Sequence, residues 1–279
     1  MSIATCKTLE YRAALCRQKV LRMIAAGKAG HMGGSMSCLD VMTALYFHTM
    51  NIDPTAPKDS QRDRFILSAG HKCMALYAVL CERGFFEEAL LDTYGSLGTK
   101  LPGHPDMHKL PGVEANTGAL GHGLSIATGM ALGLQDGQRV FTVLGDGELP
   151  EGSNWEAAAA ASHHKLDNLS AFVDVNGLQI SGWTKDVMDM ESISEKFAAF
   201  GWAVKEIDGH DMEQIVETLD RLPLETGKPS AIVMRTIKGK GLSFAENKVA
   251  YHYWKPDAEE FSKAEAELSE AIQRKKVAL

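Results

Sequence analysis

Apolar positions follow two different periods along the chain, and each period predicts a type of element. In residues 9–26 and 38–50 they recur at helical spacing, which predicts two helices. A short apolar run over 64–69 predicts a buried strand, and helical spacing returns in 74–83. The next stretch, 94–121, follows neither period and is rich in glycine and proline. We expect a long loop there, and such a loop in a compact domain is usually functional or disordered.

Strands and helices are expected to alternate regularly in the second half of the chain. The expected strands lie at residues 140–144, 169–175, 203–207 and 231–237. The expected helices lie at residues 124–135, 155–163, 193–200 and 212–222. This alternation predicts an α/β fold, a doubly wound parallel sheet flanked by helices. We expect residues 1–279 to form a single domain, with a charged C-terminal helix within 257–279.

Composition argues against several classes of protein. The net charge is -7 at pH 7, whereas a nucleic-acid-binding surface needs an excess of basic residues. No apolar run approaches the ~18 residues of a membrane span, and the first residues carry no signal-peptide pattern. The five cysteines include no Cys-x-x-Cys pair, which is typical of thiols in a reducing compartment. We therefore expect a cytoplasmic protein that binds neither nucleic acid nor membranes.

Two polar residues follow consecutive expected strands, and together they suggest a metal site. Asp146 follows the strand at 140–144, and Asn176 follows the strand at 169–175, so both side chains should lie at one edge of the sheet. A carboxylate, an amide oxygen and a backbone carbonyl after Asn176 would suit Mg²⁺ or Ca²⁺ when phosphate oxygens complete the shell. Gly145 and Gly147 would allow a diphosphate to approach the backbone. An Asp-Gly pair after a strand is about as often only a turn, so that alternative stays open.

Several histidines lie beside glycine or in glycine-rich turns: His31, His71, His104, His122 and His252. A lone histidine is more often a surface or core residue than a functional one. Several of them at expected strand ends and loops favour function, because imidazole donates hydrogen bonds to phosphate or hydroxyl oxygens and moves protons near neutral pH. Their spacing matches no helical zinc motif. We expect contacts to a substrate or a diphosphate rather than to a metal.

Sequence motifs along almost the whole chain resemble one enzyme family. The segments GDGELPEG (145–152) and DVNGLQISG (174–182) are similar to the thiamin diphosphate signature. Five further segments resemble the N-terminal domain of transketolases: GHMGGSMSCLDVMTALYF, DRFILSAGHK, LPGHP, TGALGHGLSIATGMAL and IDGHD. The resemblance implies a thiamin-diphosphate-binding fold of the diphosphate-domain type, with thiamin diphosphate and a divalent metal as cofactors.

The resemblance also implies roles for individual residues. The metal, Mg²⁺ or alternatively Ca²⁺ or Mn²⁺, would be held by Asp146, Asn176 and the backbone carbonyl of Leu178. Cofactor contacts are implied for His71, Gly118, Leu120, Gly145, Asp146, Gly147, Glu151, Asn176 and His252. The implied catalytic set is His31, His71, His104 and His252. Glu151 is in addition similar to an acidic residue that links two active sites across a subunit interface.

The chain departs from the family pattern at two positions. Ala119 stands where the family usually has proline in the cofactor turn, a change that removes no ligand. Tyr253 stands where we expect glycine after His252, within the segment YHYW (251–254). The second departure leaves open whether His252 keeps the family role.

The resemblance implies one half of a divided enzyme. A full-length transketolase continues into a pyrimidine-binding domain, which carries the glutamate that activates the cofactor, whereas this sequence stops after a charged helix. We therefore expect the N-terminal subunit of a split transketolase, which forms an active heterotetramer with a separate C-terminal subunit. The expected reaction transfers a two-carbon ketol unit from a ketose phosphate to an aldose phosphate.

Three alternatives remain at this point. Two are other divided thiamin-diphosphate enzymes: a 2-oxoacid dehydrogenase subunit, or a relative of deoxyxylulose-phosphate synthase, whose style KGKGLSFAEN (238–247) shares. The third is a non-catalytic, cofactor-binding regulatory module. The sugar and the pathway stay open, because the residues that read the sugar phosphate would lie mainly on the other subunit.

Overall fold

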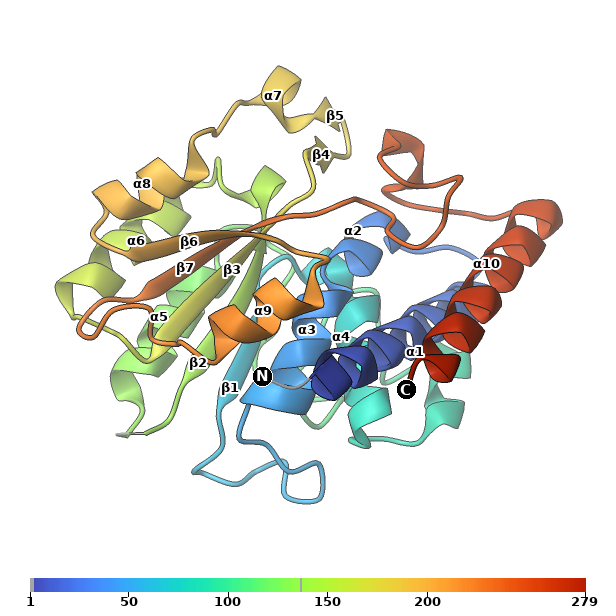
Figure 1. Cartoon of the computed structure of the whole chain (residues 1–279), viewed down its shortest axis with the longest axis horizontal. Helices are drawn as coiled ribbons and strands as arrows, with labels where there is room; N and C mark the ends of the chain where they lie inside the picture. The colour runs from blue at the N-terminus through green and yellow to red at the C-terminus, as the bar shows by residue number, and fades with distance from the viewer. Residues whose placement is uncertain (1–2, 136) are drawn as a thin grey trace.

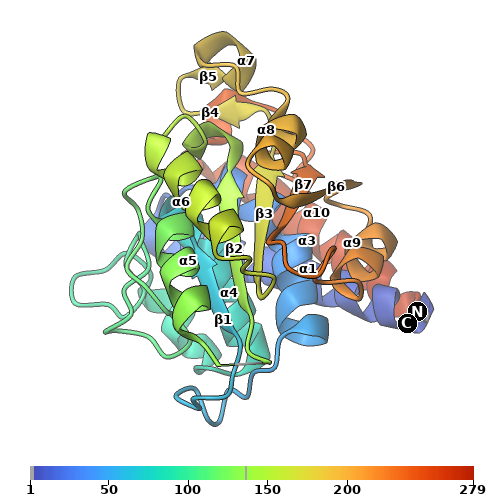
Figure 2. The same ribbon diagram turned by 90° about the vertical axis from the view of Figure 1, so that its left-hand side faces the viewer.

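The computed structural model describes residues 3–135 and 137–279, and within them a five-stranded parallel sheet lies at the centre (Figures 1 and 2). The strand order is β1-β2-β3-β7-β6. These strands are β1 (Arg64–Leu67), β2 (Val140–Gly145), β3 (Leu169–Val175), β6 (Ala203–Asp208) and β7 (Ser230–Arg235). Gly145 lies opposite Asp174 in the parallel register. The residues that follow β2 and β3 therefore meet at one edge of the sheet.

Helices cover both faces of the sheet (Figure 2), because successive side chains of a buried strand point to opposite sides. Phe141 and Phe172 belong to one core, and Leu144 and Val173 belong to the other. The first core is covered by α1 (Ile3–Gly27), α2 (Met32–Ser37), α3 (Leu39–Ala44), α4 (Cys73–Arg83), α9 (Met212–Leu219) and α10 (Ala258–Val277). The second core is covered by α5 (Gly123–Gly133), α6 (Gly152–His163) and α8 (Ile193–Ala199). In the described part of the chain, none of the helices combines the length and apolar character that crossing a bilayer requires.

The expected α/β alternation is confirmed, with small shifts at the element ends. The strand expected at 169–175 coincides with β3, whereas the strand expected at 231–237 is β7, which ends at Arg235. It ends there because the amide of Ile237 donates to the imidazole of His210 instead of to a neighbouring strand, at 2.8 Å. The expected C-terminal helix is α10, whose first turn is capped by the side chain of Asp257.

The single helix expected over residues 38–50 is wrong. The chain forms α2, then α3, and then a π-helical turn, η1 (Leu45–Thr49). Cys38 separates α2 from α3, and the adjacent Ser37 hydroxyl donates to the carboxylate of Asp174 at 2.6 Å. A serine that hydrogen-bonds outside its helix favours a helix end. The break therefore depends on a tertiary contact that spacing along the sequence does not reveal.

A small projection after β3 was missing from the sequence-based prediction. It consists of the antiparallel strands β4 (Leu178–Gln179) and β5 (Gly182–Trp183), followed by the short helix α7 (Thr184–Val187). Figure 1 shows it beyond the carboxyl ends of the central strands. Strands of this length contain too few positions for a period to be recognised.

The long loop expected over 94–121 is confirmed, since these residues form neither helix nor strand. Its first half is tied to α4 by the hydroxyl of Tyr77, which donates to the carbonyl oxygens of Pro102 (2.9 Å) and His104 (3.2 Å). The loop thereby brings His104 and Gly118 to the carboxyl edge of the sheet.

Helix α5 begins in close contact with the segment that follows β1. A Cβ atom on Gly123 would lie 2.4 Å from Cα of Ser68, whereas a Cβ on Gly129 in the same helix would meet no atom within 4 Å. The backbone contact at Gly123 sets how closely α5 packs on the sheet.

We expect Gly123→Ala to destabilise the protein by about 1 to 3 kcal/mol, because the backbone of Ser68 must move. The matched control Gly129→Ala should stabilise it by up to about 1 kcal/mol, because alanine favours an exposed helix interior more than glycine does. Urea denaturation of both variants measures the two free energies of unfolding. Equal changes in the two variants would contradict the packing argument.

Candidate functional site

A cavity opens at the carboxyl ends of the central strands. Its lining residues come from several elements and loops: His31, His71, Lys72, Gly118, Leu120, Gly145, Asp146, Gly147, Glu148, Asn176, Leu178, Gln179, Ile180, Lys238 and His252. Most of the residues proposed from the sequence are therefore neighbours in space. This position is the usual ligand site of open α/β sheets.

The three expected metal ligands lie together at this edge. Both carboxylate oxygens of Asp146 accept backbone N–H groups, from Gly147 at 2.8 Å and from Gly177 at 2.6 Å. The amide oxygen of Asn176 accepts the N–H of Leu178 at 3.2 Å. Burial raises the pKa of Asp146 to about 6; the nearby carboxylate of Asp174 adds to the rise and the Lys72 ammonium opposes it. The turn after β3 is thus bonded directly to the turn after β2.

Beneath these ligands lies a buried ion pair between Asp174 and Lys72. The carboxylate of Asp174 accepts the Lys72 ammonium at 2.6 Å and the Asn176 amide N–H at 3.2 Å. It also accepts the hydroxyls of Ser37 and Thr236. Burial opposes the charge on Asp174, but Lys72 and the other donors outweigh it and lower its pKa. Because the amide nitrogen of Asn176 is held by Asp174, its oxygen is turned away toward Asp146 and the cavity.

A second buried cation, Lys238, lies on the other side of the cavity. Its ammonium donates to the carbonyl oxygen of Leu178 at 2.7 Å and lies 2.9 Å from Nδ1 of His252. Burial, together with the charge of Lys72, lowers the pKa of Lys238 to about 8. The contact assigns His252 the tautomer in which Nδ1 accepts and Nε2 carries the proton.

The four histidines proposed as catalytic gather around His31. The ring centroids of His71, His252 and His104 lie 5.4, 5.6 and 6.1 Å from that of His31. Burial is the main cause that lowers the pKa of His31 to about 4, of His71 to about 2 and of His252 to about 3. Burial also lowers the pKa of His104. At neutral pH the cluster therefore consists of uncharged imidazoles, each able to donate and accept one hydrogen bond.

The cofactor turn around Gly118 is shaped by glycine. Gly118 has φ +147°, and a Cβ atom there would lie 2.6 Å from Cδ2 of His104. Glu148 closes the other side of the turn, because its carboxylate accepts the N–H groups of Gly121 at 2.9 Å and Gly145 at 3.2 Å. Glu148 is 1% exposed and also accepts the hydroxyl of Ser68.

Two residues singled out from the sequence lie away from the cavity lining. Glu151 is exposed at the start of α6, and His122 is exposed beside the carbonyl of Leu120. Three residues of the lining were not predicted from the sequence: Lys72, Glu148 and Lys238. A signal existed for Glu148, three residues after Gly145 in a capping-box spacing. Lysines carry no such signal, because most of them are exposed.

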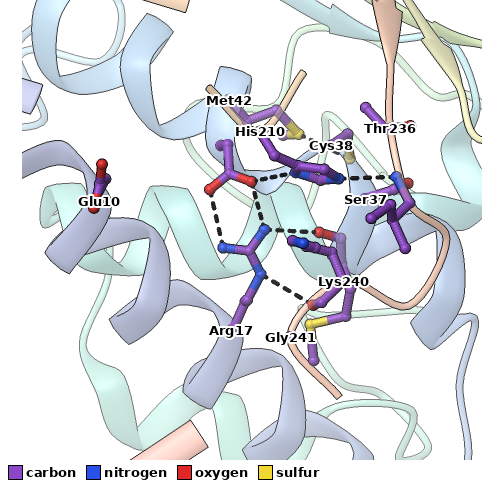
Figure 3. Close-up of polar contacts among 12 residues, drawn as sticks. Glu10, Arg17, Ser37, Cys38, Met42, His210, Thr236, Lys240 and Gly241 are labelled. Carbon is purple, nitrogen blue, oxygen red and sulfur yellow. Dashed lines mark hydrogen bonds and ion pairs between the residues drawn. The ribbon is translucent and has the colours of Figure 1, made fainter. Parts of the chain in front are cut away.

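The IDGHD motif lies under the site rather than in it. Figure 3 shows His210 between the carboxylate of Asp40 and the backbone N–H of Ile237, at 2.7 and 2.8 Å. Arg17 donates two hydrogen bonds to Asp40, at 3.0 and 2.7 Å, and one to the carbonyl of Lys240 at 3.2 Å. Burial opposes the charge of Asp40, but Arg17 and His210 hold its pKa well below the usual range. This network fixes the backbone on both sides of Lys238.

Comparison with known families decides what the cavity is. Residues 11–275 match the family described as transketolase, thiamine diphosphate binding domain. The chain belongs to this transketolase family. The resemblance stated from the motifs is confirmed, and with it the diphosphate-domain fold and thiamin diphosphate binding.

Two of the similar curated proteins are subunits of transketolases. One, from Phocaeicola vulgatus, is a subunit of apulose-4-phosphate transketolase and is 44% identical over 271 residues, covering 96% of both chains. The 6-deoxy-6-sulfo-D-fructose transketolase subunit SqwG of Clostridium sp. is 45% identical over 263 residues, covering 93% of this chain and 96% of its own. The transketolase of Homo sapiens is 38% identical over 236 residues, which cover 83% of this chain and 37% of the human one.

Solved transketolases have the same fold. The enzyme of Campylobacter jejuni matches 99% of this chain with a TM-score of 0.87 and 28% identity. The enzyme of Leishmania mexicana matches 96% of it with a TM-score of 0.84 and 26% identity. The chain spans 46% of the length of each of these two structures.

We expect Asp174→Asn to lower the free energy of unfolding by about 3 to 5 kcal/mol at pH 7, because it leaves the Lys72 ammonium buried without a counter-charge. The control Ser37→Ala removes one neutral donor from the same carboxylate and should cost about 1 kcal/mol. Urea denaturation measures both.

The pH dependence follows from the lowered pKa of Asp174. In the wild type, the contribution of this carboxylate is present above its unfolded pKa of about 4 and is lost as pH falls through the folded value. The Asp174→Asn variant should lose this acid-side slope. A variant as stable as Ser37→Ala would contradict the buried-pair interpretation.

Proposed function

We propose that this chain is the diphosphate-binding subunit of a two-subunit transketolase, which transfers a two-carbon ketol unit from a ketose phosphate to an aldose phosphate. The observation that supports this most directly is that Asp146, Asn176 and the Leu178 carbonyl share one cavity with a cluster of neutral histidines. The first set suits a metal diphosphate, and the second suits a polyhydroxylated sugar.

The residues fit a divalent metal and a diphosphate. Asp146, Asn176 and Leu178 offer hard oxygen ligands, which favour Mg²⁺, with Ca²⁺ and Mn²⁺ as alternatives. The buried ammonium groups of Lys72 and Lys238 supply positive charge for the diphosphate. A metal at the Leu178 carbonyl would compete with its hydrogen bond from Lys238, so we expect Lys238 to turn toward the phosphate oxygens when the metal binds.

The chain's own side chains hold and orient the reactants. Thiamin diphosphate, when bound, supplies the nucleophilic carbon for carbon–carbon bond cleavage and formation. We assign His71, Gly118 and His252 to cofactor contacts, as the sequence resemblance implied. His31 and His104 would hydrogen-bond the hydroxyls and the carbonyl oxygen of the donor, and stabilise the negative charge that develops there.

Partner and compartment belong to the same proposal. Similar proteins are named as subunits of transketolases, and a transketolase of this kind needs a second polypeptide to complete its cofactor site. We propose a heterotetramer with a separate C-terminal subunit, in which Glu151 lies at a contact between subunits and residues 1–279 form one domain. The cytoplasm is the proposed compartment, supported by the buried thiols Cys16, Cys38, Cys73 and Cys81, which form no disulfide.

The substrates are proposed as a class, a ketose donor and an aldose acceptor that carry an anionic group. The similar proteins differ in this respect, since their names refer to apulose 4-phosphate and to 6-deoxy-6-sulfo-D-fructose. We therefore propose phosphorylated sugars in general and no particular pathway.

We expect ketol transfer from xylulose 5-phosphate to ribose 5-phosphate only when this chain is mixed with its C-terminal partner, Mg²⁺ and thiamin diphosphate. Asp146→Ala should lower that activity by more than about 100-fold, because it removes a metal ligand. Asp186→Ala, which removes an exposed carboxylate in α7, is the control and should leave it unchanged.

Calorimetry of cofactor binding separates the possible failures. The mixture should bind thiamin diphosphate in the presence of Mg²⁺, and the Asp146→Ala mixture should not. Cofactor binding without transfer from any phosphorylated ketose would overturn the proposed reaction and favour a regulatory module. Wild-type binding that persists in Asp146→Ala would overturn the proposed metal site.

A further inference from the structure

One aromatic side chain beside the histidine cluster has no place in the site described so far. Tyr253 directly follows His252, and its ring lies edge-on to His31, with 4.9 Å between the centroids and 78° between the planes. This centroid separation is shorter than those between His31 and the other three histidines. Tyr253 is nevertheless 52% exposed.

The neighbours of Tyr253 hold it firmly in this position. Tyr251 and Trp254 both donate to the carboxylate of Glu260 in α10, at 2.8 and 2.9 Å. The backbone of Trp254 also forms two hydrogen bonds with Gly30, the residue before His31, at 3.0 and 2.8 Å. The outer aromatic residues of the segment thus anchor it to the protein. The two middle residues, His252 and Tyr253, are left at the cluster.

The hydroxyl of Tyr253 differs from those of the other tyrosines near the cluster. Tyr251 donates to Glu260, and the Tyr77 hydroxyl donates to two carbonyl oxygens. Within residues 3–135 and 137–279, no protein group hydrogen-bonds the Tyr253 hydroxyl. A rigidly held phenol with a free hydroxyl, half-exposed at the edge of a polar site, is suited to bind a polar ligand.

We propose that Tyr253 contacts the ketose donor and is a specificity-determining residue of the site. Its ring forms one wall of the donor site beside His31, and its hydroxyl hydrogen-bonds a hydroxyl of the sugar chain. This inference rests on the proposed function, because it presumes that the sugar enters beside His31 and His104. The glycine expected at this position would provide neither the wall nor the hydrogen bond.

The test compares Tyr253→Phe and Tyr253→Gly in the complete mixture of both subunits, Mg²⁺ and thiamin diphosphate. Xylulose 5-phosphate and the longer fructose 6-phosphate serve as donors, with ribose 5-phosphate as acceptor for the first and erythrose 4-phosphate for the second. Tyr253→Phe should raise KM for xylulose 5-phosphate by about 3- to 10-fold and leave kcat unchanged, because it removes one neutral hydrogen bond. Tyr253→Gly should in addition raise the ratio of kcat/KM for fructose 6-phosphate over xylulose 5-phosphate by about 5-fold or more, because it opens the wall.

Tyr251→Phe is the matched control. It removes the hydroxyl of another tyrosine in the same segment, which bonds Glu260 and not the site, so both donor KM values and their ratio should stay within about twofold of wild type. Donor KM values and a donor ratio that also stay within that range in both Tyr253 variants would overturn the proposal. A changed ratio in Tyr253→Gly, with an unchanged KM in Tyr253→Phe, would support the wall and overturn the hydrogen bond.

A second readout needs neither partner, cofactor nor sugar. Burial is the main cause of the low pKa of His31, about 4, and the remaining neighbours of His31 are His71, His104, His252 and Lys238. Tyr253→Gly should hydrate His31 and raise its pKa toward the ordinary value of about 6.5, as measured by NMR titration of the isolated chain. An unchanged pKa would overturn the contact itself. An inactive wild-type mixture, together with a raised pKa, would instead overturn the proposed function and leave the ring contact intact.

Discussion

The buried ion pair between Lys72 and Asp174 is the interaction on which the rest of the site depends. Two opposite charges in an apolar interior are stable only when each has its partner and further hydrogen bonds. Asp174 meets this condition by joining the end of β3 to α2, to the segment after β7, and to the residue that follows His71. It also holds the amide of Asn176, so the orientation of a proposed metal ligand is a consequence of the same pair.

The second constraint is the exclusion of water from the histidine cluster. Imidazoles are partly protonated near neutral pH in water, but here burial and the neighbouring lysines keep them neutral. The positive charge of the cavity is therefore confined to Lys72 and Lys238, at the side that suits a diphosphate. The neutral histidines face the side that suits a sugar, where hydrogen bonds rather than charges are needed to recognise hydroxyl groups.

Much of the fold and part of the site were predictable because they depend on local patterns. Long apolar periods predicted α4, α5 and the central strands, and two strand ends located Asp146 and Asn176. The prediction failed for residues 38–50, where the side chain of Ser37 bonds a residue far along the chain, and for β4 and β5, which are too short to show a period.

The sequence by itself determined the α/β alternation and the residue types that can bind a metal diphosphate, because both follow from neighbours along the chain. Only the tertiary structure decided which charges pair, since Lys72 and Asp174 are separated by 102 positions. It also decided that Glu148 rather than Glu151 lines the cavity, and that Tyr253 lies against His31. Burial, charge pairing and ring contacts are properties of packed elements, and no local pattern encodes them.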